Sequence, residues 1–292
     1  MKTEIEQYLA ASGKKFSLKD YDTKYTGKQD KEDGEKKLDE IKSRLSVFQE
    51  TLYAADSQAL LIIFQAMDAA GKDSAIEHVM SGLNPQGCEV HSFKTPNSLE
   101  YSHDFLWRHY LALPAKGKIG IHNRSHYENV LVCKVHPEYI LAENIPGIDE
   151  VKDIDKKFWE RRYESIRNFE AHLIANGTTI IKFFLHVSKE EQKQRFLDRI
   201  NDPKKNWKFS EGDLAERKLW GDYMDAYETA IQETSTKDAP WYVIPADQKW
   251  HARVAISKIM EATFEKLNLK FPELAPEELE RLDDIKQRLA KD

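Results

Sequence analysis

The sequence predicts an α/β protein in which a mostly parallel sheet is flanked by helices. Residues 60–64 form an uninterrupted apolar run, which suits a strand buried on both faces. Between residues 60 and 122, runs of this kind alternate with segments whose apolar residues recur every three or four positions. A chain of 292 residues with 40% hydrophobic side chains can form one large domain, or two smaller ones, with an ample core.

Composition argues against several classes of protein. The formal net charge of −6 does not suit a nucleic-acid-binding protein with a generally basic surface. Cys88 and Cys133 are the only cysteines and lack metal-ligand spacing, which favours a reducing compartment. The N-terminal segment is charged where a signal peptide needs an apolar core, and no apolar run approaches the ~20 residues of a membrane span. We therefore expect a cytoplasmic protein with no nucleic-acid partner and no membrane partner.

An arm and a helix are expected before the first strand. Residues 1–33 are polar and rich in Lys, Asp and Gly, which is typical of an irregular surface segment. In residues 34–55, Leu38, Ile41 and Leu45 are three and four positions apart, as on the buried side of an amphipathic helix. This helix leads into the strand at residues 60–64.

Two further strands are expected before residue 123. Residues 88–93 read as a second strand, and a helix capped by Asn97 or Ser98 is predicted to start near Leu99 and to end at Pro114. Residues 119–122 form the third strand. In a parallel sheet built in this way, ligands gather at the carboxyl ends of the strands.

The second half of the chain continues the same alternation. Ser188 and Glu191 have the spacing of a capping box, so a helix is expected to start there and to stop before Pro203. Trp241 and Trp250 are expected in the core. The remaining elements are predicted as an irregular crossover at residues 134–154, a helix at 156–176, a strand at 178–187, a helix at 217–234, a strand at 239–246, a helix from 247 to about 267 and a charged helix within 271–292.

The turn after the strand at residues 60–64 has the layout of a phosphate-binding loop. Gly71 and Lys72 close a short loop of small residues, and a helix is expected from Ser74. Backbone N–H groups, the positive end of a helix dipole and a lysine together attract an anion. The pattern G-x4-G-K-[ST] is incomplete, because Ala66 and Asp73 replace the first Gly and the hydroxyl residue. An ordinary strand–helix turn is the alternative.

Asp68 gives this loop a more specific meaning. A carboxylate in a phosphate loop is repelled by the anion unless a cation lies between them, so it implies bound Mg²⁺ or a role in proton transfer. The loop at residues 66–73 resembles the Walker A variant of the family-2 polyphosphate kinases. Those enzymes move a terminal phosphoryl group between polyphosphate and a nucleotide.

A second candidate segment, Asn-Arg-Ser-His-Tyr-Glu, leaves the end of the third strand. Arg124 can bind phosphate oxygens with two N–H groups, and Glu128 can hold Mg²⁺ directly or through water. The alternative is a helix cap with a surface salt bridge. The segment resembles the family's Walker B region, Asp-Arg-Ser-x-Tyr, but has Asn123 where many members have Asp. Asn123 together with Glu128 resembles the subgroup that accepts both AMP and ADP.

Residues 192–208 are basic in an otherwise acidic chain. Two acidic side chains, Asp198 and Asp202, oppose six basic ones, which leaves a local charge of +4; the basic residues are Lys193, Arg195, Arg199, Lys204, Lys205 and Lys208. The segment is interpreted either as a solvated basic face or as a mobile lid over a polyanion, with Trp207 packing the hinge or stacking on a base. It also resembles the lid module of the family.

The resemblance implies a P-loop three-layer α/β/α sandwich like that of thymidylate kinase, with a helical lid. The domains would be an arm at 1–33, the kinase domain at 34–270 with a lid at about 190–222, and a helical tail at 271–292. The implied reaction is reversible transfer of phosphoryl groups from inorganic polyphosphate to AMP or ADP, with Mg²⁺ or Mn²⁺. Guanine nucleotides are further candidate substrates, and a homo-oligomer, dimer or tetramer, is expected.

The predicted site has catalytic, metal-binding and substrate-binding residues. Asp68, Lys72, Asn123, Arg124 and Glu128 are the predicted catalytic residues, of which Asp68 and Glu128 would also bind the metal. Contacts with phosphate or nucleotide are predicted for Ala69, Ala70, Gly71, Asp73, Ser74, Lys94, Arg108, Arg162, Arg195, Arg199, Lys205 and Lys208.

Two other functions remain open at this point. One is an ATP-dependent nucleoside monophosphate kinase with the same fold. The other is a non-catalytic nucleotide or polyphosphate sensor, which the departures at Ala66, Asp73 and Asn123 suggest. The basic segment at 192–208 favours a long polyanion but does not decide between them.

Overall fold

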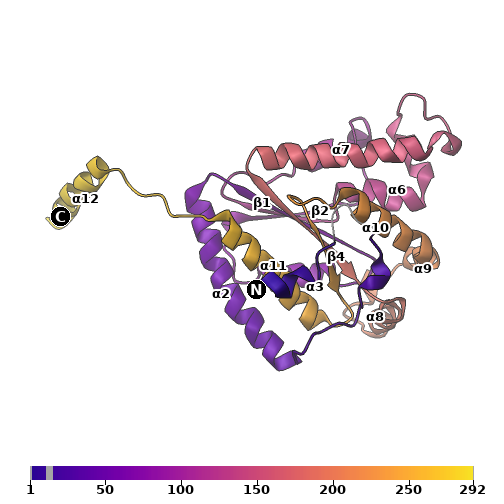
Figure 1. Cartoon of the computed structure of the whole chain (residues 1–292), viewed down its shortest axis with the longest axis horizontal. Coiled ribbons are helices and arrows are strands. Elements are labelled where there is room, and N and C mark those ends of the chain that lie inside the picture. The colour runs from indigo at the N-terminus through magenta and orange to yellow at the C-terminus, as the bar shows by residue number, and fades with distance from the viewer. Residues whose placement is uncertain (1, 11–15, 292) are drawn as a thin grey trace.

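The computed structural model describes residues 2–10 and 16–291, and its centre is a five-stranded parallel sheet (Figure 1). The strands lie in the order β2-β3-β1-β4-β5, and every pair of neighbours is parallel. Their bounds are β1 Ala59–Ala66, β2 Cys88–Ser92, β3 Ile119–Asn123, β4 Thr178–His186 and β5 Trp241–Pro245. The predicted α/β class and all five predicted strands are confirmed.

The strand register brings the ends of β1 and β3 together. Phe64 lies opposite both Asn123 of β3 and Phe183 of β4, and the Arg124 N–H donates to the Phe64 carbonyl at 3.0 Å. Because parallel strands end at the same edge of the sheet, the two sequence segments predicted to form the site leave the sheet side by side.

Helices cover both faces of the sheet, which gives three layers (Figure 1). On one face, α11 packs on α2 and α3; on the other, α7 packs on β4 and α10 packs on α7. Their bounds are α2 Lys31–Ala55, α3 Lys72–Met80, α7 Lys156–Ala175, α10 Trp220–Thr234 and α11 Lys249–Leu267. Shorter helices are α1 Lys2–Glu6, α4 Ser98–Tyr101, α5 Trp107–Tyr110 and α6 Val132–Val135.

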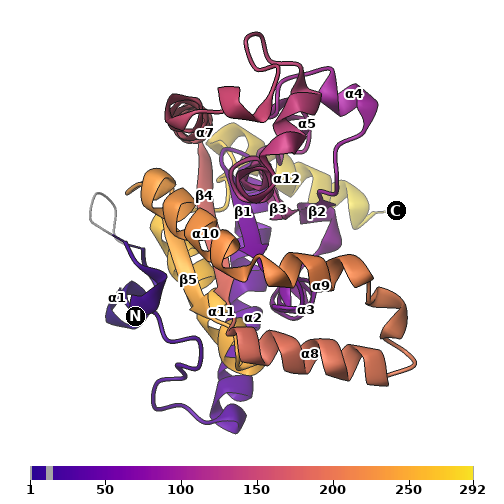
Figure 2. The same cartoon turned by 90° about the vertical axis from the view of Figure 1, so that its right-hand side faces the viewer.

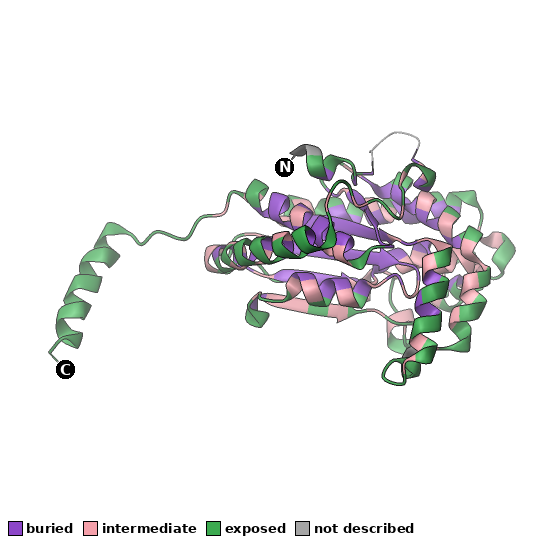
Figure 3. Cartoon of the chain, turned by 90° about the horizontal axis from the view of Figure 1, so that it is seen from below, coloured by how far each residue is buried: buried purple, intermediate pink, exposed green. Residues whose placement is uncertain are grey.

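Two helices lie over the carboxyl edge of the sheet, and one projects from the body. α8 Lys189–Asn201 and α9 Glu211–Lys218 run side by side next to α3 (Figure 2). α12 Pro276–Leu289 extends away from the sheet, and all of its residues are exposed (Figure 3). Within the described residues, no helix combines the length and the apolar character that a membrane crossing requires.

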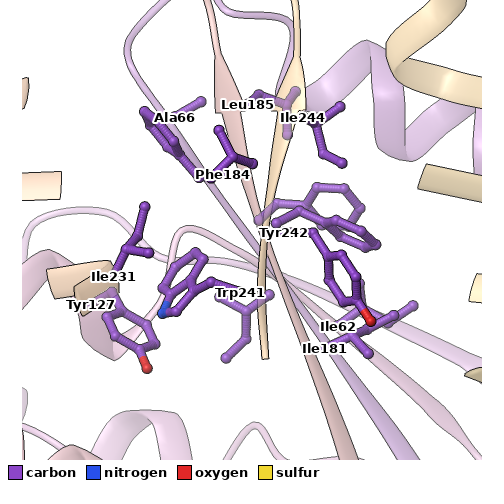
Figure 4. Close-up of a cluster of buried hydrophobic side chains, with 14 of the residues drawn as sticks. Ile62, Ala66, Tyr127, Ile181, Phe184, Leu185, Ile231, Trp241, Tyr242 and Ile244 are labelled. Atoms are coloured by element: carbon purple, nitrogen blue, oxygen red, sulfur yellow. The ribbon is translucent and has the colours of Figure 1, made fainter. Parts of the chain in front are cut away.

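A continuous apolar core lies between β4, β5 and the helices that cover them (Figure 4). Trp241 is 1% exposed, and its indole N–H donates to the Thr234 hydroxyl at 2.9 Å. The rings of Phe184 and Tyr227 stack at 4.2 Å. The expected core position of Trp241 is therefore confirmed, whereas Trp250 is only half-buried.

Several predicted helix bounds are wrong. The segment expected to be an irregular arm contains α1 and a 3-10 turn at Leu18–Asp20, and α2 starts at Lys31 because Asp30 caps it. The helix expected from Leu99 to Pro114 is split into α4 and α5. The Asp104 carboxylate accepts the Leu106 N–H, and a local bond of this kind competes with the helical pattern.

Corrections also apply to the second half of the chain. The expected 217–234 helix breaks at Leu219 into α9 and α10, and the crossover at 134–154 contains the end of α6 and two 3-10 helices. At the start of α8, Ser188 caps the Glu191 N–H as predicted. The reciprocal half of the capping box is absent, because the Ser188 N–H donates to Asp247 and the Glu191 carboxylate pairs with Arg195.

Candidate functional site

The loop between β1 and α3 adopts a backbone that ordinary side chains rarely take. Ala69 has φ +60° and Gly71 has φ +101°. Gly71 tolerates this conformation freely, but a left-handed alanine costs on the order of 1–2 kcal/mol. Strain of this kind persists where the surroundings impose it, and it is frequent at binding sites.

Lys72 lies beneath this loop as the first residue of α3. Its side chain is buried, and its Nζ donates to the Ala66 carbonyl at 3.2 Å. Burial lowers the pKa of Lys72, and the nearby Arg124 lowers it further, against the opposing effect of Asp68, Glu128 and Asp73. The nearby carboxylates therefore compensate only part of the positive charge of Lys72, as expected for a group that binds an anion.

Arg124 links the two segments of the site. It has φ +62°, a second strained non-glycine backbone. Its Nη2 lies 3.0 Å from Oδ1 of Asp68, and its Nη1 lies 3.8 Å from Oε2 of Glu128. Burial raises the pKa of Glu128, while Arg124 and Lys72 oppose that rise. Two carboxylates from different strand ends therefore converge on one guanidinium.

The two unusual residues of the motifs contact each other. The Asn123 amide donates to the Asp73 carboxylate at 2.7 Å. An aspartate in place of Asn123 would bring two carboxylates together, which is unfavourable. One step further along α3, the Ser74 hydroxyl accepts a hydrogen bond from Arg253 at 2.8 Å.

Two side chains of α8 contact the backbone of the loop. Gln192 donates to the Asp68 carbonyl at 2.9 Å, and Arg195 donates to the Ala69 and Ala70 carbonyls at 3.2 and 2.6 Å. Both side chains are buried. The predicted site residues Ala69 and Ala70 are thus part of the loop, and Arg195 lies next to their carbonyl groups.

The later residues of the basic segment lie further out. Arg199 pairs with Asp213 at 3.5 Å, and the exposed Lys205 pairs with Asp202 at 2.7 Å. Trp207 is 73% exposed, and its indole N–H donates to the Lys204 carbonyl at 3.1 Å. The side chain of Lys208 lies outside the described part of the structure.

The other predicted binding residues line or approach a hollow beyond β2. Arg108 pairs with Glu100 at 3.1 Å and donates to the Lys94 carbonyl at 2.8 Å. Arg162 forms a two-bond pair with Glu143 at 2.9 and 2.8 Å. The hollow is open to solvent and is lined by Pro96, Glu100, Tyr101, His103, Asp104, Phe105, Arg108, Asn129 and Glu143.

The carboxylates of the site suit a metal that substrate helps to hold. Mg²⁺ usually binds one or two protein carboxylates together with water and substrate phosphates. Asp68 and Glu128 approach the same guanidinium and supply such a pair. Across residues 2–10 and 16–291, no group of three or more His, Cys, Asp or Glu side chains is arranged to hold a metal without further ligands.

Sequence reasoning missed the role of Gln192 and the proximity of α10. Asp68 and Glu128 both raise the pKa of Tyr223 and of Tyr227, although burial is the larger cause in each tyrosine. Gln192 lies inside the predicted lid motif, but the prediction for that segment rested mainly on its charged residues. Its spacing of four residues from Phe196, on the helix predicted to start at Ser188, was the available signal, because a polar residue on the apolar face of a helix needs a hydrogen-bond partner.

Comparisons with known proteins agree with this arrangement. A family model described as polyphosphate kinase 2 matches residues 28–272. The ADP-polyphosphate phosphotransferase of Rhodopseudomonas palustris is 49% identical over the full length of both chains. The AMP/ADP-polyphosphate phosphotransferase of Meiothermus ruber is 42% identical over 92% of this chain and 96% of that protein. The crystal structure of polyphosphate kinase 2 from Arthrobacter aurescens TC1 is 40% identical, with a TM-score of 0.84 over 95% of this chain and 98% of that one.

Proposed function

Because this chain belongs to the polyphosphate kinase 2 family, we propose that it transfers phosphoryl groups from inorganic polyphosphate to AMP or ADP, forming ADP or ATP in a reversible reaction. The observation that carries the proposal is the convergence of Lys72, Arg124, Asp68 and Glu128 on one loop at the carboxyl edge of the sheet. Cations there match the donor phosphates, and carboxylates match a bridging metal.

The loop and its two cations bind the donor. Lys72 and the loop N–H groups cradle the terminal phosphoryl group, next to the positive end of α3. Arg124 exchanges its contact with Asp68 for phosphate oxygens, and its planar guanidinium suits two parallel N–H···O bonds. Transition-state charge on the transferring group is thereby neutralised without a large movement of the protein.

Asp68 and Glu128 would hold the divalent metal together with the substrate phosphates, and Mg²⁺ is the proposed ion, with Mn²⁺ as an alternative. When bound, the metal neutralises charge on the phosphates and fixes their orientation. Release of Arg124 toward phosphate frees both carboxylates for this role. The Asn123 amide keeps Asp73 hydrogen-bonded at the side of the site.

The bond changes are simple and need no protein base. An oxygen of the nucleotide's terminal phosphate attacks the terminal phosphorus of polyphosphate, and the P–O bond to the rest of the chain breaks. The electron pair of that bond stays on the oxygen of the departing polyphosphate, which is now one phosphate unit shorter. Since the attacking phosphate is already ionised, positioning and electrostatics supply the catalysis.

The acceptor nucleotide is proposed to bind in the hollow beyond β2. Tyr101 and Phe105 offer aromatic surface to a base, and Arg108 offers a guanidinium to a phosphate. We further propose that guanine nucleotides are accepted, that residues from about 202 to 210, between α8 and α9, form the moving part of the lid, and that the chain works as a dimer or tetramer.

One assay tests the reaction. The purified protein is incubated with AMP or ADP, Mg²⁺, and either polyphosphate or ATP as donor, and the nucleotides are separated by chromatography. Formation of ADP or ATP from polyphosphate alone is the expected result. Product only with ATP would instead identify a nucleoside monophosphate kinase, and absence of product with both donors would indicate a sensor.

A further inference from the structure

Three carbonyl groups of the phosphate loop are turned toward α8. Three successive carbonyls, those of Asp68, Ala69 and Ala70, accept hydrogen bonds from Gln192 and Arg195. In the described structure, the N–H groups of Ala69 and Gly71 have no acceptor. These three acceptors of the loop are therefore satisfied, whereas two of its donors are available to a ligand.

Arg195 has no donor left for a phosphate. A guanidinium carries five N–H groups. In Arg195, Nε donates to the Glu191 carboxylate at 2.8 Å, Nη1 donates to the two loop carbonyls, and Nη2 donates to the carbonyls of Ala246 and Asp247 at 2.6 and 3.1 Å. The side chain is 7% exposed. It joins the loop to the exit of β5.

Gln192 is held in place from its other side. Its side-chain oxygen accepts a hydrogen bond from Arg217 of α9 at 2.8 Å, while its amide nitrogen donates to Asp68. Arg217 also donates to the Lys189 carbonyl at 2.7 Å, which ties α9 to the first turn of α8. Each donor that contacts the loop is thus fixed by a second partner.

We propose that Gln192 and Arg195 are positioning residues that hold the three loop carbonyls away from the donor phosphates and so leave the loop N–H groups facing them. This proposal rests on the proposed function and deepens it, because it separates the cations that touch phosphate from one that orients the loop. A carbonyl oxygen aimed at a phosphate would repel it, and a loop free to rotate its peptides would lose entropy on binding.

The alternative role for Arg195 is direct contact with phosphate. The two roles predict different effects of Arg195→Lys on the binding of phosphate. A lysine keeps the charge but cannot make the forked set of bonds to four carbonyls. Direct contact predicts that Arg195→Lys retains most binding. Positioning predicts that Arg195→Lys binds poorly, and that the uncharged Gln192→Leu is also impaired.

The test measures binding before activity. Dissociation constants for tripolyphosphate are obtained by calorimetry without nucleotide or metal, for the full chain and for Arg195→Lys, Gln192→Leu and Gln194→Leu. Gln194 is exposed on the same helix and donates to Asp198, so its variant makes the same change as Gln192→Leu away from the loop. We expect Kd to rise at least tenfold for Arg195→Lys and about five- to tenfold for Gln192→Leu, and less than twofold for Gln194→Leu.

Steady-state kinetics supply the second readout. Positioning predicts a lower kcat and a higher KM for polyphosphate in Arg195→Lys and Gln192→Leu, with an unchanged KM for ADP. Melting temperatures measured without ligand separate this effect from lost stability. Near-normal tripolyphosphate affinity in both variants would overturn the proposal, as would an affinity that falls in Arg195→Lys but not in Gln192→Leu.

Failure of the proposed function gives a different pattern. The unsubstituted chain would then transfer no phosphoryl group from polyphosphate, whereas the calorimetric comparison of the variants would still report whether the loop is oriented by α8.

Discussion

The middle of α8 and the loop that follows this helix both carry basic residues, but these residues do different things. In the middle of the helix, Arg195 is buried and all five of its N–H groups donate to fixed partners. Past the end of the helix, Lys205 is exposed and pairs with its near neighbour Asp202. Arg195 contacts the phosphate loop, whereas Lys205 makes its ion pair within its own loop.

This difference shows that local charge does not reveal the role of a basic residue. A cation whose donors are occupied by carbonyls stabilises a backbone shape, and it attracts a polyanion only weakly. A cation in solvent can follow a polyanion, but salt screens it. The predicted lid at about 190–222 therefore divides into an anchored part that contains Arg195 and an outer part that contains Lys205.

The strongest test of the comparison is Lys72→Met, on the anchored side. Removal of the buried ammonium under the loop should lower kcat by about 10²–10³, which corresponds to about 3–4 kcal/mol. Initial rates with polyphosphate and ADP measure the effect. Lys266→Met, at an exposed position in the last turn of α11, is the matched control and should stay at the unsubstituted rate. Near-full activity of Lys72→Met would remove this lysine from the mechanism.

Acid stability tests the buried layer under the site. Burial is the main cause that lowers the pKa of His122 to about 4, and the ordinary value is 6.5. As the pH falls, the unfolded chain binds a proton at His122 before the folded chain does. The contribution of His122 to the free energy of unfolding is therefore fully present above pH 6.5 and is lost between pH 6.5 and about 4. Across that window, the free energy of unfolding falls by about 3 kcal/mol for this one group.

His122→Gln should therefore flatten the pH dependence of the unfolding free energy in that window. Urea titrations at pH 7, 6, 5 and 4 measure it, and the slope should decrease by up to about 1.4 kcal/mol per pH unit. His103→Gln, at an exposed position, should leave the slope unchanged. If the plot of unfolding free energy against pH has the same slope in His122→Gln as in His103→Gln and the unsubstituted chain, His122 does not control acid unfolding.

The contrast also explains what could be predicted from the sequence. The strands were predictable because short apolar runs between turn residues are typical of buried strands. The register of β1 and β3 then brings Asp68 and Arg124 together. The burial of Arg195 was not predictable from residues 192–208, since the carbonyls that surround it come from the loop at 66–72 and from Ala246. Hydrogen bonds between segments far apart in the chain leave no local pattern.

Short-range competition accounts for the other errors. The segment from Leu99 to Pro114 has the apolar spacing of one helix, but the Ser102 hydroxyl donates back to Leu99 and Asp104 accepts from Leu106. These bonds satisfy the backbone in another way, so the helix ends after Tyr101. The αL conformation of Ala69 could not be predicted from the sequence either, because alanine normally favours a right-handed helix.

A smaller effect is expected from Asp68→Asn, which keeps the shape of the loop and removes one carboxylate. The variant should need about tenfold more Mg²⁺ for half-maximal activity, because a neutral amide binds Mg²⁺ more weakly than a carboxylate. Activity measured against Mg²⁺ concentration tests this expectation, after metal has been removed with a chelator. Asp149→Asn, at an exposed position, is the control. An unchanged Mg²⁺ requirement in Asp68→Asn would exclude Asp68 as a ligand.

The smallest effect should come from the loop that follows α8. Lys204→Gln together with Lys205→Gln removes two exposed charges beyond the loop. KM for long-chain polyphosphate should rise about two- to fivefold at low salt, and the difference should fade at 0.5 M salt because exposed charges are screened there. KM for tripolyphosphate should stay unchanged, since a short chain bound at Lys72 does not reach that far. An equal rise for both donors, or a rise that persists at high salt, would place these lysines in the anchored group with Arg195 and remove the distinction between the helix and the loop that follows it.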